Sequence, residues 1–123
     1  MGTFRELKAY TKAFQLALDI HHKTKVFPKE EQFALTSQIR RSSRSVCINM
    51  GEGFRKLRYK AHFVAKITDA DMENSETQIW LDFALAFEYI TGQEHSDFYQ
   101  RSAEVGRLLN HIIENTGSYG AAG

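Results

Sequence analysis

The sequence is poor in residues that interrupt helices or cross-link chains. Its 123 residues include one proline, Pro28, and one cysteine, Cys47. A lone cysteine excludes an internal disulfide and is typical of a reducing compartment. Glycines cluster near residues 51–53 and at the end of the chain. Together with the scarcity of proline, this favours a few long elements over many short strands.

Long hydrophobic runs are also missing. No apolar segment approaches the length that spans a membrane, and the opening residues MGTFRELKAY lack the apolar core of a signal peptide. The composition, 42% hydrophobic and 25% charged, is that of an ordinary globular protein, and the length suits one domain. We therefore expect a cytoplasmic protein.

Motifs for catalysis and metal binding are absent as well. The acidic run DADMENSE, residues 69–76, cannot form an EF-hand because positions six and twelve are Asn74 and Trp80, where Gly and Glu are needed. The histidines do not have metal-ligand spacing, and there is neither a serine-hydrolase elbow nor a glycine-rich phosphate loop. The sequence predicts no catalytic residue, no metal and no cofactor, so we do not expect an enzyme.

What the sequence does contain is four amphipathic segments. They predict helices over residues 4–26, 28–54, 59–90 and 96–115, in a domain of residues 1–116 followed by a flexible tail over 117–123. Pro28 suits a first helical turn, Gly92 a helix C-cap and Ser96 an N-cap. The all-α antiparallel up-and-down four-helix bundle joins four such helices by short connections.

Apolar residues recur in each segment at spacings of three and four. The expected buried stripes are Leu7, Tyr10, Phe14, Ala17, Leu18 and His21 in the first helix; Leu35, Ile39, Ser42, Val46, Met50 and Gly53 in the second; and Phe98, Ser102, Val105, Leu109 and Ile112 in the fourth. The run IWLDFALAFEYI in the third helix is apolar on every side, which predicts a subunit interface in addition to the core.

Charge is distributed unevenly along the chain, although the formal net charge is only +1. Residues 36–66 hold eight lysines and arginines against one acid, Glu52, whereas residues 67–99 hold eight acids and neither lysine nor arginine. Such asymmetry within one domain concerns partners or self-association and not the fold.

The stretch QIRRSSRSVCINMGEG, residues 38–53, places Arg40, Arg44 and Gly51 on the side of the second helix away from its core stripe. Three interpretations stay open. The arginines are solvated, or they pair with the acidic third helix of the same or a neighbouring subunit, or they bind nucleic-acid phosphates. Tyr10, Phe54, Tyr59 and His62 could add base stacking, although aromatic residues at helical spacing mostly belong to a core.

The segment FPKEEQFALTSQIRRSSRSVCINMGEGFRK, residues 27–56, resembles the signature of the bacterial four-helix-bundle proteins encoded in intervening sequences of large-subunit ribosomal RNA genes. The resemblance extends over roughly residues 4–113. Ser42 and Ser43 replace the usual alanines, the usual capping serine before the third helix is missing, and the acidic run DADMENSE stands where relatives often have small residues.

The resemblance implies a ring-like homopentamer, similar to the accessory protein of diversity-generating retroelements, which works with a reverse transcriptase and RNA. We therefore expect a homo-oligomer that binds structured RNA and neither a membrane nor a small-molecule substrate. The expected nucleic-acid-binding residues are Arg40, Arg41, Arg44, Arg55, Lys56 and Arg58, and the expected oligomer interface is Ile48, Gly51, Trp80, Phe83 and Phe87. The alternative is a protein-interaction scaffold in which the basic second helix pairs with the acidic third helix of a neighbouring subunit.

Overall fold

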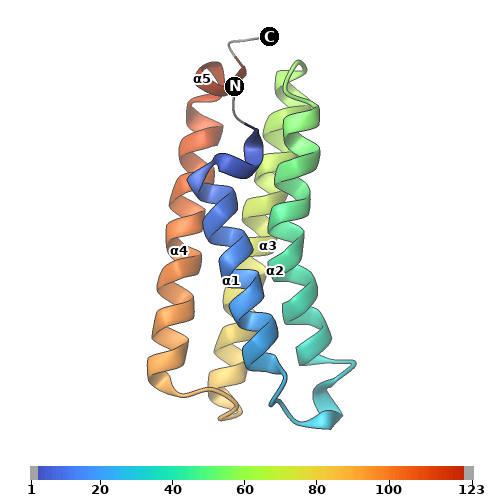
Figure 1. Ribbon diagram of the computed structural model, residues 1–123, viewed down its shortest axis with the longest axis vertical. Helices are drawn as coiled ribbons and strands as arrows, with labels where there is room; N and C mark the ends of the chain where they lie inside the picture. The colour runs from blue at the N-terminus through green and yellow to red at the C-terminus, as the bar shows by residue number, and fades with distance from the viewer. Residues whose placement is uncertain (1–2, 121–123) are drawn as a thin grey trace.

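The computed structural model describes residues 3–120. It contains short 3₁₀ turns at Phe4–Glu6 and Lys29–Glu31 and the helices α1 (Lys8–Thr24), α2 (Leu35–Arg55), α3 (Lys60–Ala86), α4 (Gly92–Glu114) and α5 (Thr116–Gly120). The four long helices run alternately up and down, and α4 returns to pack beside α1 (Figure 1). The predicted all-α four-helix fold is confirmed. None of the helices among residues 3–120 is long and apolar enough to cross a lipid bilayer.

Several predicted helix boundaries differ from those in the structure. Pro28 precedes the 3₁₀ turn, and α2 begins only at Leu35, whose backbone N donates to Glu31 Oε1 at 3.2 Å. The third helix is shorter than predicted, because it ends at Ala86 and Glu88 adopts a positive φ of 64°. Left-handed backbone at a non-glycine residue interrupts a helix at a steric cost.

The fourth helix starts earlier than Ser96. Thr91 and Glu94 form a capping box, in which Glu94 N donates to Thr91 Oγ1 at 3.1 Å and Thr91 N donates to Glu94 Oε1 at 2.8 Å. These bonds satisfy donors that the first helical turn otherwise leaves unpaired. Gly92 is therefore the first residue of α4 and not the C-cap of α3.

Part of the predicted tail is helical. Residues 116–120 form α5, where Thr116 is buried and the Tyr119 ring lies 6.3 Å from that of Phe54. The aromatic contact attaches this short helix to the end of the bundle. The remaining tail residues, 121–123, lie outside the described part of the chain.

The predicted core stripes are confirmed for two helices and wrong for one. The stripes of α2 and α4 are buried throughout. On α1, by contrast, the buried residues are Ala9, Ala13, Leu16, Ala17, Ile20 and Thr24, whereas Phe14 and Leu18 from the expected stripe are 47% and 40% exposed. The small alanine side chains allow α1 to approach the bundle closely. Phe14 and Leu18 lie on the side of α1 that borders α2.

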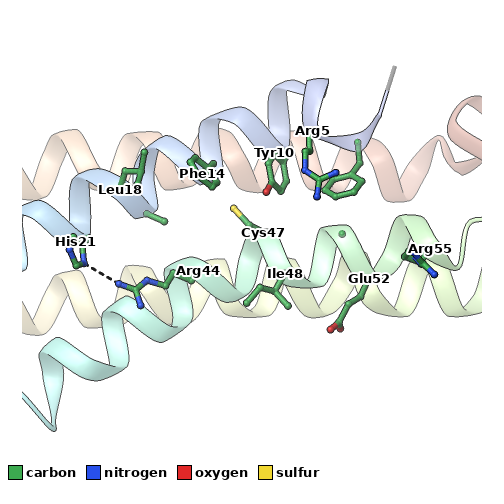
Figure 2. Close-up of a pocket in the computed structure, with 13 residues that line it drawn as sticks. Arg5, Tyr10, Phe14, Leu18, His21, Arg44, Cys47, Ile48, Glu52 and Arg55 are labelled. Carbon is green, nitrogen blue, oxygen red and sulfur yellow. Dashed lines mark hydrogen bonds between the residues drawn. The ribbon is translucent and has the colours of Figure 1, made fainter. Parts of the chain in front are cut away.

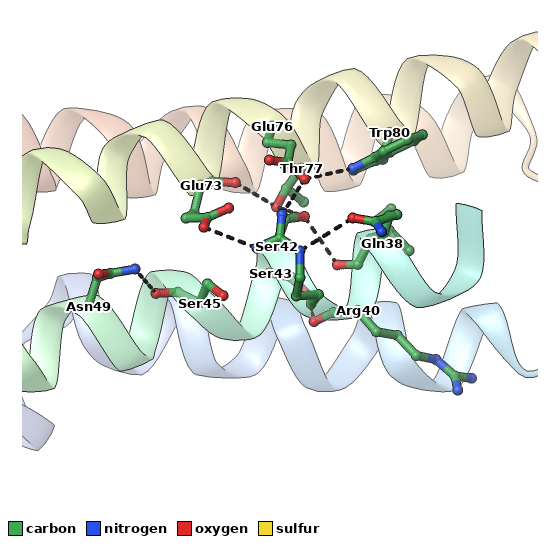
Figure 3. Close-up of polar contacts among 12 residues, drawn as sticks. Gln38, Arg40, Ser42, Ser43, Ser45, Asn49, Glu73, Glu76, Thr77 and Trp80 are labelled. Carbon is green, nitrogen blue, oxygen red and sulfur yellow. Dashed lines mark hydrogen bonds and ion pairs between the residues drawn. The ribbon is translucent and has the colours of Figure 1, made fainter. Parts of the chain in front are cut away.

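A polar layer separates the core into two apolar clusters. Asn74 Nδ2 donates to Ser102 O at 2.8 Å, Ser102 Oγ donates to Asn74 Oδ1 at 2.8 Å, and Gln78 Nε2 donates to Ser102 Oγ at 3.0 Å. Ser42 and Thr77 join their hydroxyl groups at 2.8 Å between α2 and α3 (Figure 3). Because all these groups find partners, their burial costs little and fixes which residues face each other.

Replacing Asn74 with alanine tests the polar layer. The substitution removes the amide that bridges α3 and α4 and leaves Ser102 with fewer partners. We expect Asn74→Ala to lower the free energy of unfolding by about 1–3 kcal/mol, measured by urea denaturation. Asn110→Ala is the control, because Asn110 is exposed and bonds only within α4. An equal loss in both variants would contradict a specific role for the layer.

Candidate nucleic-acid interface

The six cations expected to bind nucleic acid do not lie on one surface. Arg40 is half-buried against α1, where its Nε donates to Thr24 Oγ1 at 2.8 Å and its Nη2 donates to His21 O at 3.4 Å. A cation at the carboxyl end of a helix also interacts favourably with the helix dipole. Arg40 thus joins α2 to α1, and its charge is engaged within the chain.

Arg41 points in the other direction, toward α3. Its guanidinium forms ion pairs with Glu73, at 3.1 Å, and with Glu76. The hydrogen bonds that Arg41 donates to these two carboxylates raise the pKa of its guanidinium. One of the three interpretations of the arginines, pairing with the acidic third helix of the same subunit, therefore holds for this residue.

Arg44 lies at one end of a groove between α1 and α2. Its Nη2 donates to His21 Nδ1 at 3.0 Å. Burial is the main cause that lowers the pKa of His21, and Arg40 and Arg44 lower it further. A neutral imidazole can accept this bond, whereas a protonated one could not.

The groove has a volume of about 790 Å³ and an apolar middle. Phe14 and Leu18 border it from α1, and Cys47 and Ile48 border it from α2 (Figure 2). Burial raises the pKa of the Cys47 thiol to about 11, so the residue is a poor nucleophile at neutral pH. The groove is therefore better suited to bind an apolar surface than to catalyse a reaction.

Gly51 is less open than the sequence indicated. The Phe4 ring covers it, so that a Cβ at this position would lie 3.3 Å from Phe4 Cζ. Gly51, a residue of the expected oligomer interface, is thus in contact with the first 3₁₀ turn of its own chain. Sequence reasoning gave Phe4 no function, because one aromatic residue before a helix has no characteristic pattern.

The remaining cations gather at the end of α2 in a connection that we call the basic turn, residues 55–60. It contains Arg55, Lys56 and Arg58 from the expected set and, in addition, Lys60. All four are exposed, and no ion pair involving them occurs among residues 3–120. The basic turn lies at the same end of the bundle as α5 (Figure 1).

The expected oligomer-interface residues differ in their exposure. Ile48 is 57% exposed, and Phe83 and Phe87 are about half exposed. Trp80 is partly buried, and its Nε1 donates to Glu76 Oε2 at 3.0 Å. Rings continue from Trp80 through Phe83 and Phe87 to Tyr89, with centroids 5.6–5.9 Å apart. The carboxyl end of α3 therefore presents an aromatic surface.

The acidic run on α3 has structural partners of its own. Glu73 and Glu76 bind Arg41, and Asn74 belongs to the polar layer. Within the described residues, no group of three or more histidine, cysteine, aspartate or glutamate side chains is placed to hold a metal ion.

The fold and these surfaces define a helical bundle with a basic end and exposed apolar flanks. Residues 5–111 match the family of 23S rRNA-intervening sequence proteins, and the chain belongs to this family. No curated protein matches the sequence. A crystal structure of a protein with unknown function from the S23 ribosomal protein family of Bacteroides thetaiotaomicron is similar, with a TM-score of 0.76 and 27% sequence identity over 87% of this chain and 96% of that one.

The ion pairs of α3 predict a pH dependence. The hydrogen bond from Trp80, followed by that from Arg41, lowers the pKa of Glu76 below its usual 4.5. A carboxylate with a lowered folded-state pKa stabilises the protein above its unfolded-state pKa, and this contribution is lost as the pH falls through the folded-state pKa. Glu76→Gln should therefore reduce the urea midpoint at neutral pH and become equivalent to the wild type in acid.

The measurement is urea denaturation of both proteins at neutral pH and near pH 3, followed by Trp80 fluorescence and circular dichroism. Glu30→Gln is a control, since the exposed Glu30 side chain forms no hydrogen bond or ion pair among residues 3–120. If Glu76→Gln lowered the urea midpoint by the same amount at both pH values, the ionised Glu76 carboxylate would not be the source of the stabilisation.

Proposed function

We propose that this chain is a non-catalytic helical bundle that binds structured RNA through the basic turn. The observation that carries the proposal is the set of four exposed cations, Arg55, Lys56, Arg58 and Lys60, without an ion pair inside the described chain. Phosphate groups are the partners that such a set attracts most strongly, since binding releases condensed counterions.

The position of the basic turn supports this proposal. Arg40 and Arg41 are held by contacts to α1 and α3, so recruiting them would cost hydrogen bonds that stabilise the bundle. The cations of the basic turn can bind a polyanion without that cost. The acids Glu6 and Glu52 share this end, but Glu6 accepts from Thr3 N and Glu52 from Lys66 Nζ.

The RNA proposal predicts the effect of charge reversal. Lys56→Glu combined with Arg58→Glu should weaken binding of a structured RNA by at least about tenfold at low salt and reduce the slope of log affinity against log salt by about two. Fluorescence anisotropy over a salt series measures both quantities. Lys25→Glu with Lys29→Glu, which changes two exposed lysines at the opposite end, is the matched control. Equal losses in the two pairs would indicate only a net-charge effect.

A second role, self-association, has a separate observation in its favour. Phe14, Leu18 and Ile48 are exposed along the groove, and Met72, Ile79 and Phe83 are exposed on α3. Contiguous exposed apolar residues are typical of protein interfaces. Because the groove and α3 lie on different sides of the bundle, contact between them would be head to tail, which closes a ring when the rotation permits. We propose a homo-oligomer, and five is the subunit number that the family resemblance implies.

Self-association predicts that a charge placed in the groove separates the subunits. Ile48→Asp should reduce the mass measured by size exclusion with light scattering toward 14.1 kDa. Val26→Asp, at an exposed apolar residue in the α1–α2 connection, should leave the mass unchanged. A wild-type protein that is already a monomer at micromolar concentration would contradict this role, and an Ile48→Asp oligomer would exclude the groove from the interface.

A further inference from the structure

Tyr59 stands in the middle of the basic turn with its ring in solvent. The side chain is 58% exposed, and no hydrogen bond to its hydroxyl occurs among residues 3–120. Arg58 and Lys60 flank it directly in the chain. A large aromatic side chain gains nothing from such a position in an isolated bundle, because exposure of apolar surface to water is unfavourable.

The backbone around Tyr59 is held in place. Lys56 N donates to Gly53 O at 2.8 Å, Tyr59 N donates to Lys56 O at 2.8 Å, and Phe63 N donates to Tyr59 O at 2.9 Å. Leu57 packs against the apolar core and anchors the turn. The turn therefore presents Tyr59 and its cations without the entropic cost of ordering a flexible loop on binding.

The other aromatic residues considered for base stacking have different environments. The Tyr10 and Phe54 rings pack with Phe4 at one margin of the core. His62 is exposed and lies edge-on to Tyr59, with centroids 6.1 Å apart and planes at 80°. Of the four candidates, only Tyr59 and His62 are exposed, and both belong to the basic end.

We infer that the basic turn binds unpaired nucleotides, with a base stacked on the Tyr59 ring and the adjoining phosphates on Arg58, Lys60 and Lys56. An aromatic platform between cations is the arrangement that binds single strands, because every base has a π face and every nucleotide a phosphate. Paired bases are already stacked and do not offer this face. The inference rests on the proposed RNA function and specifies which part of the RNA is bound.

The test compares a twelve-nucleotide uridine strand, the matching thymidine strand and a twelve-base-pair RNA duplex by fluorescence anisotropy. Tyr59→Ala should weaken binding of the uridine strand by about tenfold or more, the loss of one stacked base, and change duplex binding by less than about twofold. Tyr59→Phe keeps the ring and should bind like the wild type. The thymidine strand should bind within a few-fold of the uridine strand, since the ring and the cations do not contact the ribose hydroxyl.

Tyr99→Ala is the matched control, because Tyr99 is also exposed but lies on α4. Circular dichroism checks that each variant is folded. A second measurement needs no variant: photo-cross-linking of a strand with one 5-iodouridine should attach it to the peptide that contains Tyr59.

Each contrary result has a separate meaning. Equal weakening of strand and duplex by Tyr59→Ala, failure of Tyr59→Phe to bind, loss of thymidine-strand binding, or cross-linking to another tyrosine would overturn the inference. If Tyr59→Ala has no effect while the Lys56→Glu, Arg58→Glu pair still weakens RNA binding, only the stacking inference fails. Wild-type protein that binds neither strand nor duplex would overturn the proposed function as well.

Discussion

Close packing of the long helices depends on small buried side chains, and several other features of the molecule follow from that constraint. Ala9 and Ala13 are almost completely buried on α1, and Gly53 occupies a buried position on α2. A Cβ on Gly53 would lie 3.0 Å from Ile67 Cδ1, so α2 and α3 come close together at this glycine. The inward side of α1 is formed by Ala9, Ala13, Leu16, Ala17 and Ile20, so Phe14 and Leu18 lie on another side of the helix. These residues remain at the margin, where they border the groove.

The buried side of a helix was predictable where the helix has one apolar stripe, and the prediction was wrong where the helix has two. On α4, spacing alone identifies Val105 and Leu109 as buried. On α1, the alanines and the stripe of Phe14 and Leu18 both repeat with helical periodicity, and periodicity does not indicate which stripe faces inward. Helix ends depend on a few local bonds. The Thr91–Glu94 capping box was present in the sequence as TGQE, but Gly92 suggested a helix end instead.

The candidate site was only partly accessible from sequence for a geometric reason. Arg40 and Arg41 are neighbours in the chain, yet they diverge by about 100° around a helix, and the structure directs one to α1 and the other to α3. Which side of α2 meets which helix is a property of the packed bundle. Arg58 lies beyond α2, which ends at Arg55, in the turn that follows. The sequence identified the cations, and packing determines which remain available to a partner.

Cys47 gives the groove a natural chemical reporter. It is the only cysteine of the chain, it borders the groove, and its thiol is largely protonated at neutral pH. Alkylation at this sulfur requires both access from the groove and loss of the proton, so its rate measures how often the groove is uncovered. If another subunit filled the groove, the Cys47 thiol would be alkylated more slowly than in a single chain, whose groove is open to the reagent.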